Sequence, residues 1–365
     1  MRITTAGDSH GKGLFGIVEG FPAHFKPDLS GINRALKLRR LVYGRGARMK
    51  LESDHVEILS GMWNGETSGA PLTFFIKNVS TTPPNRKTSV PRPGHADFAG
   101  MLKYDFNDAR IVTERASARR TAMDVAIGEF FRQALEKVGI KVWGYTVGIG
   151  NFETDEETLQ TPLIEEHPLL CPDSRIEKLM ITKIDEAEKN GSSLGGKIRV
   201  MASGVPIGLG TFNTYQGRFT SKIAHALFDI PSVRGVLFGD ILETYKLEGY
   251  ETIDEIRKVG MRRTNHAGGI EGGMSNGQLI SIDLLVKPVP TQKRGVTTID
   301  MNDGLETITN YVRSDTCVVA AVAIVSRAIL STVLFSELMK EFGSSTFEEL
   351  CERVDLYRRR VRING

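Results

Sequence analysis

The chain has 365 residues, with 47 Lys and Arg against 44 Asp and Glu, giving a formal charge of +3. Its content of 40% hydrophobic and 25% charged residues is typical of globular proteins and excludes a disordered, collagen-like or coiled-coil protein. The small net charge argues against a general nucleic-acid-binding protein, which usually carries a strong basic excess. Glycine is unusually frequent, with 38 residues that cluster between Gly7 and Gly20 and between Gly260 and Gly277. Such clusters indicate backbone that lies close to a ligand.

The cysteines and the apolar segments indicate where the chain resides. Cys171, Cys317 and Cys351 are far apart and have no metal-ligand spacing. We therefore expect no disulfide framework and predict a cytoplasmic protein. The longest apolar run, 317–325, is about half a bilayer span and predicts a buried helix segment, with no membrane partner. The first residues lack the pattern of a signal or transit peptide.

In chain order, local patterns predict the elements of the first half. These are strands at 2–6 and 14–19, a helix capped by Asp28 or Ser30 that runs to Val42, strands at 54–60 and 70–78, an irregular loop at 79–94, a short helix at 95–104, and a long helix at 114–138 that ends before Gly139.

The second half repeats this plan. Segment 194–208 is similar to 13–23, 275–288 is similar to 67–78, and 313–325, which enters a helix ending near Gly343, is similar to 114–128. This predicts a single domain over 1–365 with a duplicated strand-and-helix unit in 1–140 and 194–343. The predicted class is α+β with paired antiparallel sheets, in preference to a doubly wound parallel sheet.

The first glycine loop matches three well-known motifs, none of which fits its surroundings. Residues 11–16 match the dinucleotide motif G-x-G-x-x-G, and 7–11 match the serine-hydrolase motif G-x-S-x-G around Ser9. Both motifs require a helix after the loop, whereas a strand is predicted there. A P-loop would need one more residue and a Ser or Thr for magnesium. A hydrolase using Ser9 and a nucleotide- or RNA-binding module remain the rival functions.

Two histidines lie in loops rich in turn-forming residues: His10 in GDSHG and His95 in RPGHAD. A histidine in such a loop, rather than in an apolar stripe, favours proton transfer over core packing. The spacings Asp8-x-His10 and His95-x-Asp97 are alternatively compatible with metal ligation. No further His or Cys cluster completes a coordination sphere, so no metal is predicted.

Arginines gather at the glycine loops and near the predicted long helices. They are Arg39, Arg45 and Arg48, then Arg92, then Arg115 and Arg119 in the first turns of the first long helix, and Arg313 before the second. A solvated face is the alternative for any one of them, but together they predict a pocket for a small polyanionic ligand. Asp315, expected in the first turn after Arg313, is either a helix cap or a general base.

Seven motifs in order resemble the chorismate synthase family over nearly the whole chain. They are GDSHG (7–11), VYGRGARM (42–49), RPGHADF (92–98), ERASARRTAM (114–123), RRTNHAGGIEGGMSNGQ (262–278), KPVPT (287–291) and RSDT (313–316).

The resemblance implies a phosphate lyase that catalyses the last step of the shikimate pathway. The family removes phosphate and a carbon-6 hydrogen from 5-enolpyruvylshikimate 3-phosphate by anti-1,4-elimination, giving chorismate. It requires reduced FMN without net redox change, and NADPH is a candidate reductant. The family fold, a β-α-β-α sandwich that forms a homotetramer, agrees with the duplicated unit predicted above.

The resemblance also implies roles for individual residues. His10 would be the acid that assists phosphate departure, His95 would protonate or steady the reduced flavin, and Asp315 would help to deprotonate it. Flavin contacts would come from Arg115, Ala116, Ser117, Pro231, Ser232, Gly272, Lys287, Pro288, Val289, Pro290, Thr291 and Arg313. Substrate contacts would come from Ser9, Arg39, Arg45, Arg48, Arg92 and Arg119, and Arg39 and Arg45 also match NADP positions.

The sequence departs from the family pattern in three places. Asp8 replaces the usual Glu, which bears on how His10 is oriented. Pro231 and Ser232 replace an Asn-Ala pair, so a flavin contact there would use a carbonyl or hydroxyl group, because proline has no N–H to donate. The loop between Asn78 and Arg92 is shorter than in many bacterial members.

Overall fold

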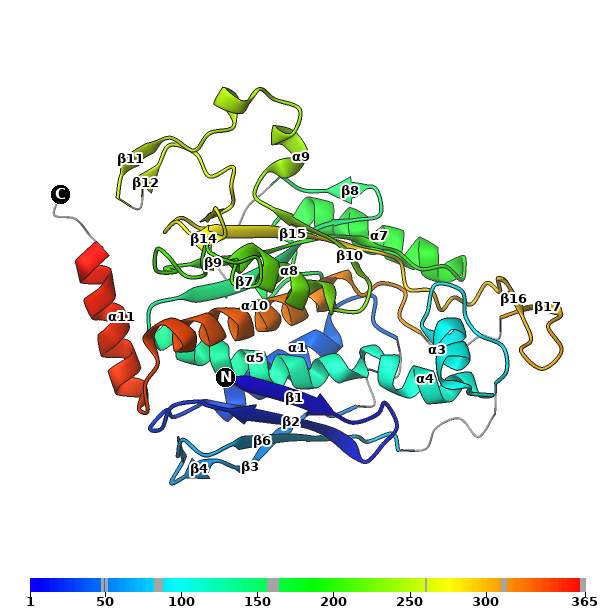
Figure 1. Cartoon of the computed structure of the whole chain (residues 1–365). Coiled ribbons are helices and arrows are strands. Elements are labelled where there is room, and N and C mark those ends of the chain that lie inside the picture. The colour runs from blue at the N-terminus through cyan, green and yellow to red at the C-terminus, as the bar shows by residue number, and fades with distance from the viewer. Residues whose placement is uncertain are drawn as a thin grey trace.

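The structure is a computed structural model that describes residues 1–46, 49, 52–81, 88–155, 164–259, 261–309 and 314–361. Two antiparallel sheets lie on opposite sides of a set of helices (Figure 1). The first sheet contains, in spatial order, β1 (Arg2–Ala6), β2 (Gly13–Glu19), β6 (Leu72–Lys77) and β3 (Val56–Ser60). The second contains β10 (Val233–Phe238), β15 (Ile280–Val286), β9 (Gly196–Ser203), β7 (Lys141–Ile149) and β8 (Phe152–Glu153). The predicted α+β class and antiparallel pairing are confirmed.

The remaining elements are helices and short two-stranded ribbons. The helices are α1 (Leu29–Leu41), α3 (Asp97–Tyr104), α4 (Ala109–Ala116), α5 (Thr121–Lys137), α7 (Ser174–Lys189), α8 (Phe219–Phe228), α9 (Ile241–Thr244), α10 (Val319–Phe342) and α11 (Phe347–Val361), with 3₁₀ turns η1 (Ala118–Arg120) and η2 (Gly249–Glu251). The ribbons pair β4 (Met62–Trp63) with β5 (Glu66–Thr67), β11 (Ile256–Lys258) with β12 (Met261–Arg262), β13 (Ile270–Glu271) with β14 (Met274–Ser275), and β16 (Thr297–Ile299) with β17 (Glu306–Ile308).

The core lies where α5 and α10 cross between the two sheets. Helix α5 packs on β2 and β6, α10 packs on β7 and β9, and the two helices contact each other more extensively than any other pair of elements. The most apolar 18 residues of helix α10 have a mean hydropathy of 2.0, and the helix is long enough to cross a membrane, but 78% of that window is buried inside the protein. It is therefore a core helix, which confirms the prediction of a buried segment at 317–325. The three cysteines are free, as expected.

The two halves of the chain share one order of elements. The first runs β1, β2, α1, β3, β6, α5, and the second runs β7, β9, α8, β10, β15, α10. Equivalent strands also take equivalent places, because the sheet orders are β1-β2-β6-β3 and β7-β9-β15-β10. The second set begins with β7 at Lys141, earlier than the predicted 194. Helices α5 and α10, the last elements of the two sets, pack against each other between the two sheets.

Most predicted elements of the first half are present within a few residues of their expected bounds. For α1 the structure selects Asp28 as the cap, because its side chain accepts a hydrogen bond from the backbone N–H of Ser30 at 2.9 Å. Residues 82–87 of the predicted loop at 79–94 lie outside the described residues.

The predicted long helix at 114–138 is wrong in one respect, because it is interrupted at Ser117. That residue has extended backbone angles (φ −62°, ψ 140°), and its hydroxyl accepts a hydrogen bond from the N–H of Arg119. Arg115 therefore lies in the last turn of α4, and Arg119 lies in η1. The prediction that both arginines lie in the first turns of one long helix is therefore wrong.

Asp315 was likewise predicted in the first turn of the second long helix, and the structure corrects this. Helix α10 begins at Val319 and its N-cap residue is Val318. Asp315 precedes the helix and does not cap it.

We expect a side chain at Gly128 to destabilise the protein at the crossing of α5 and α10. A Cβ there would lie 2.3 Å from the carbonyl oxygen of Ala328, so the two helices would have to separate. Gly128→Val should lower the free energy of unfolding by about 3 kcal/mol, as overpacking of a tight core does. Urea denaturation of Gly249→Ala, where a Cβ meets open space, is the control. Equal midpoints for the two variants would contradict the prediction.

The first turn of α5 contains a carboxylate that gives stability a defined pH dependence. Burial raises the pKa of Asp124 to about 6, although Arg120 opposes this shift. As the pH rises from about 4, Asp124 ionises first in the unfolded chain, so its contribution destabilises the fold progressively until the pH exceeds about 6. Asp124→Asn should therefore gain about 2 to 3 kcal/mol relative to the parent between about pH 4 and about pH 7. Urea unfolding of both proteins across this range checks it, and parallel stability curves would refute it.

Candidate active site

A cavity of about 620 Å³ opens between the two halves of the fold, which is an ordinary size for a small-molecule site. Its walls come from α1 and the loop after it, the segment before α3, the junction of α4, η1 and α5, the start of β10, the segment after β15, and the first turns of α10.

The cavity brings together most of the predicted site residues. Those on its wall are Arg39, Arg45, Arg92, His95, Ala116, Ser117, Arg119, Pro231, Ser232, Lys287, Val289, Pro290, Thr291 and Asp315. Those described elsewhere in the structure are Ser9, His10, Arg115, Gly272 and Pro288. Arg48 and Arg313 lie outside the described residues.

Two buried arginines form the base of the cavity. Arg39 donates from Nε to Thr121 Oγ1 at 3.0 Å and from Nη2 to the carbonyl oxygen of Ala118 at 2.8 Å. Arg119 donates from Nη1 to Asp54 Oδ1 at 2.5 Å and from Nε to Asn78 Oδ1 at 2.9 Å. One nitrogen of each, Arg39 Nη1 and Arg119 Nη2, is buried without a hydrogen-bond partner in the described part of the chain.

The carboxylates beside these arginines, Asp54 and Glu52, lie 3.8 Å from Arg39 Nη1 and 3.9 Å from Arg119 Nη2, which is too far for a hydrogen bond, and neither carboxylate lines the cavity. Burial, and then the charge of Arg45, lowers the pKa of Arg39 to about 10, so Arg39 is still a cation at neutral pH. A buried cation with an unused donor favours an anionic ligand, because the anion supplies both the opposite charge and the missing acceptor. The base of the cavity therefore fits a phosphate or carboxylate group.

Asp315 joins the segment before α10 to the loop after α1. Its Oδ2 lies 2.8 Å from Arg45 Nη1, and its Oδ1 accepts from the N–H of Gly46 at 2.7 Å. Gly44 accepts backbone hydrogen bonds from 316 and 317, and a Cβ on Gly44 would come within 2.9 Å of Cys317 Cβ. This glycine loop is therefore in close contact with the segment before α10. Asp315 nevertheless lines the cavity, where a carboxylate can accept a proton.

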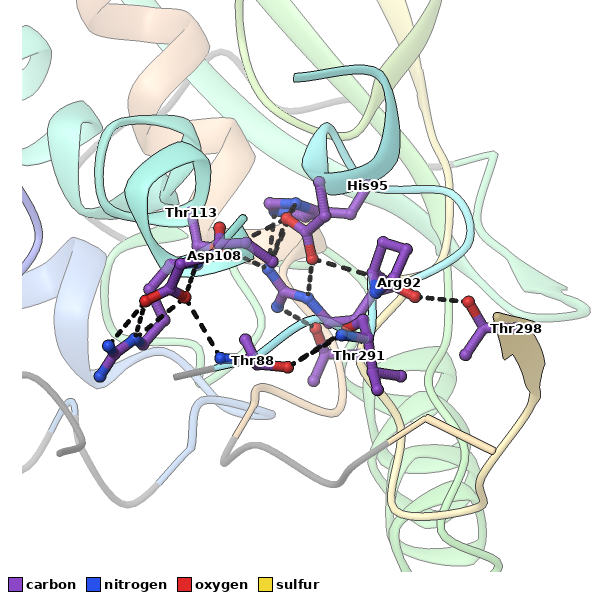
Figure 2. Close-up of polar contacts among 12 residues, drawn as sticks. Thr88, Arg92, His95, Asp108, Thr113, Thr291 and Thr298 are labelled. Atoms are coloured by element: carbon purple, nitrogen blue, oxygen red, sulfur yellow. Dashed lines mark hydrogen bonds and ion pairs between the residues drawn. The ribbon is translucent and has the colours of Figure 1, made fainter. Parts of the chain in front are cut away.

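His95 belongs to a hydrogen-bonded cluster (Figure 2). Its Nδ1 lies 2.5 Å from Asp97 Oδ1, and Arg92 donates from Nε to Asp97 Oδ2 at 2.7 Å. Arg92 also donates to Thr291 Oγ1 at 2.8 Å, and the Thr113 hydroxyl donates to Asp97. Burial would raise the pKa of Asp97, but the hydrogen bonds from His95 and Arg92 outweigh it and hold the pKa well below its usual range. A permanently ionised Asp97 thus fixes the ring of His95 through Nδ1.

The loop that carries His95 is held from outside the cavity as well. Thr298, in β16, donates to the carbonyl oxygen of Pro91 at 2.7 Å, and the N–H of Thr88 donates to Asp108 at 3.3 Å (Figure 2). Among the residues that the structure describes, no three His, Cys, Asp or Glu side chains are grouped as metal ligands would be.

His10 does not line the cavity, but it contacts Glu114, which follows the wall residue Thr113 in α4. Its Nδ1 and its backbone N–H each lie 2.7 Å from an oxygen of Glu114. The Asn78 amide donates to the carbonyl oxygens of Asp8 and Gly11, while its oxygen accepts from Arg119, so Asn78 links this loop to the base of the cavity. Strand β2 follows the loop directly, as predicted, and excludes the hydrolase and dinucleotide motifs.

Three predicted flavin positions have surroundings that refine their assignment. Arg115 donates to the carbonyl oxygens of Gly7 and Thr5, so it braces the His10 loop. Gly272 lies in the turn of the β13–β14 ribbon, beside the start of α8. It is not among the described residues that line the cavity. Ser232 accepts the N–H of Lys287 on its carbonyl oxygen at 2.9 Å, which leaves its hydroxyl for a ligand.

Several residues of the site were not predicted from the sequence. Asp54 and Asn78 lie at the ends of predicted strands, and Glu114 is the first residue of the ERASARRTAM motif. The sequence contains no stronger signal for these three residues. Asp97 was considered only as a metal ligand. Arg234, on the cavity wall, lies close enough to Lys287 that its charge adds to burial in lowering the pKa of Lys287.

The fold and this site together define an enzyme of small polyanionic ligands, with paired sheets, a buried arginine cluster and two histidine–carboxylate pairs. The family model for chorismate synthase matches residues 1–339. The chorismate synthases of Alkaliphilus metalliredigens and Thermotoga maritima are 40% and 39% identical to the chain, over 96% and 97% of its length and 97% and 96% of their own. A crystal structure of chorismate synthase, 32% identical, matches with a TM-score of 0.82 over 99% of this chain and 98% of that one. The chain belongs to the chorismate synthase family.

Family membership confirms the predicted activity and cofactor. The protein is a phosphate lyase that converts 5-enolpyruvylshikimate 3-phosphate to chorismate, the last step of the shikimate pathway, and it depends on reduced FMN.

Proposed function

We propose that the arginine-lined cavity holds substrate and reduced FMN together during the elimination. The observation that carries this proposal is the set of buried donors, Arg39 Nη1, Arg45 Nε and Arg119 Nη2, that have no hydrogen-bond partner in the described structure. The substrate has two carboxylates and a phosphate, and FMN has another phosphate. These anions supply the acceptors that the three arginines lack.

The flavin would be held by two segments that face the cavity. One is Ala116–Ser117 at the α4–η1 junction, and the other is a composite of Pro231–Ser232 with Lys287 and Val289–Thr291 beside β10 and β15. Pro288, which does not line the cavity, remains a family-based assignment. Arg115, Gly272 and Arg313 remain family-based assignments to the flavin. When bound, reduced FMN supplies an electron-rich ring that promotes loss of phosphate and the carbon-6 hydrogen without net oxidation.

The titratable side chains would divide the proton transfers between them. His10 donates a proton to the departing phosphate, which lowers the basicity that the leaving group must carry. His95, held by Asp97, stabilises charge at the flavin side through its remaining nitrogen. Asp315, held by Arg45 and the N–H of Gly46, accepts a proton. Substrate anions are bound by Arg39, Arg45, Arg48, Arg92 and Arg119, with Ser9 in the adjoining loop.

We infer that the sandwich consists of two copies of one strand-and-helix unit within a single domain over 1–365. Support comes from the matching order of the main strands and helices in the two halves, between which other elements such as α7 are inserted, and from the matching strand order of the two sheets. The predicted repeats at 1–140 and 194–343 then extend to include β7 in the second unit.

The proposal includes a homotetramer in the cytoplasm. Support for association comes from the outer face of the first sheet, where Phe15 and Ile17 are 40% and 42% exposed and Phe75 packs against Phe15 at 4.9 Å. Apolar side chains in the middle of a sheet face are typical of surfaces that another subunit covers. Three free cysteines fit a reducing compartment.

An anaerobic phosphate-release assay tests the proposed function. Release from 5-enolpyruvylshikimate 3-phosphate should require pre-reduced FMN, and an equal rate without flavin would overturn the proposal.

A parallel reaction with NADPH and oxidised FMN tests the NADP assignment of Arg39 and Arg45. Turnover in that reaction would show that the protein reduces its own flavin, and its absence would overturn the NADP assignment.

A further inference from the structure

The carboxylate of Glu114 binds both hydrogen-bonding groups of His10 that face α4. Oε1 lies 2.7 Å from the ring Nδ1, and Oε2 accepts the backbone N–H at 2.7 Å, across 104 residues of sequence. The two side chains are 16% and 22% exposed, so both are largely shielded from water. A carboxylate is well suited to this position because it can accept at both oxygens.

The backbone beside Glu114 holds the same loop. The carbonyl oxygen of Glu114 accepts the N–H of Ser9 at 3.0 Å, and the neighbouring Arg115 donates to the carbonyl oxygen of Gly7 at 3.2 Å. The last turns of α4 therefore contact residues 7, 9 and 10 in succession. This fixes the loop as well as the ring, so the imidazole has little freedom to turn.

The acidic residue inside the loop does not make this contact. Asp8 is exposed, and its carboxylate forms no hydrogen bond or ion pair with any residue of the described ranges. Only its backbone oxygen is used, by the amide of Asn78 and the N–H of Gly11. Although Asp8 is two residues from His10, the distant Glu114 is the carboxylate that orients the ring.

We propose that Glu114 is the positioning residue of His10, fixing the proton on Nδ1 so that the transferable proton is on Nε2. This rests on the proposed role of His10 as the acid for phosphate departure. In that step the Nε2–H bond breaks and an O–H bond forms on the leaving phosphate oxygen. The Nδ1–H remains bonded to Glu114, and the imidazolium becomes a neutral imidazole. The nitrogen that carries the proton is set by the hydrogen bond at the other nitrogen.

The first test reads the ring directly and does not depend on activity. Solid-state ¹⁵N NMR of histidine-labelled protein, with His10→Gln used to assign the signals, should show the Nδ1–H form of neutral His10 in the parent. In Glu114→Gln the side-chain amide has a single acceptor oxygen, and the backbone N–H of His10, which can only donate, takes it. The amide NH₂ then faces Nδ1, which must accept, so the fixed Nδ1–H signal should disappear. Asp8→Asn, which removes a carboxylate from the same loop, is the matched control and should leave the signal unchanged.

The second test is kinetic. Glu114→Gln should lower kcat about 10- to 100-fold, as loss of a residue that orients a catalytic group typically does, with little change in KM. Asp8→Asn should retain the parent kcat. Unchanged His10 signals in Glu114→Gln would overturn the role of Glu114, as would altered signals with full kcat. Full turnover in His10→Gln would instead overturn the proposed role of His10 itself, so the two failures are distinguishable.

Discussion

Replacing His10 with alanine is expected to lower kcat by about 10²- to 10⁴-fold, the usual contribution of a positioned general acid. The substrate should still bind, because its anions are held by arginines of the cavity and the imidazole acts on the leaving group only as the bond breaks. KM should therefore change far less than kcat. The loop itself should persist, since Asn78 and Arg115 hold it through backbone oxygens of residues 7, 8 and 11.

Anaerobic turnover with pre-reduced FMN measures this effect. His225→Ala is the matched control, because His225 is an exposed residue of α8 and does not line the cavity. If His10→Ala turned over as fast as the control variant, His10 would have no part in the mechanism.

Exchanging Arg39 for lysine should weaken substrate binding about 10- to 100-fold even though the positive charge is kept. The guanidinium of Arg39 uses Nε and Nη2 on Thr121 and the carbonyl oxygen of Ala118, and leaves Nη1 unused. Lysine has one nitrogen and cannot serve the protein contacts and the ligand at once. Losing one charge-assisted hydrogen bond costs about 1.5 to 3 kcal/mol, which corresponds to this change in affinity.

Equilibrium binding of the substrate, followed by calorimetry with reduced FMN present, checks the effect. Arg34→Lys, an exposed arginine on the same helix, is the control and should bind as the parent does. Equal affinities for the two lysine variants would show that Arg39 only supports the fold.

The sequence predicted which side chains line the cavity better than it predicted how they are held. His95 and Arg92 lie in the motif at 92–98 and Arg39 lies just before the motif at 42–49, so their place at one site was predictable from those motifs. The break at Ser117 did not, because Ala, Arg and Thr on either side are compatible with a continuous helix. One extended residue, capped by its own hydroxyl, separates α4 from α5. That break turns Arg119 toward Asp54 and Asn78, which lie 65 and 41 residues away.

The glycines illustrate a second limit of sequence reasoning. Their clusters suggested close approach to a ligand, yet several approach other backbone. A Cβ on Gly7 would come within 2.4 Å of the Gly13 carbonyl oxygen, and one on Gly269 would come within 2.6 Å of the carbonyl oxygen of Leu279. A glycine in the sequence indicates that the backbone approaches another group closely, but it does not identify that group. A ligand and a neighbouring chain segment exclude a side chain equally well.

The cavity wall draws on both halves of the chain: α1, η1 and α5 from the first, and β10, the segment after β15 and α10 from the second. Ligand binding is therefore coupled to the docking of the halves on one another, since neither can present the complete set of anion contacts alone. Each bound ligand stabilises the docked state by mass action. The stabilisation increases with the logarithm of the ratio of the free ligand concentration to the dissociation constant. The supply of substrate and flavin in the cell thus becomes a determinant of how long the folded protein survives.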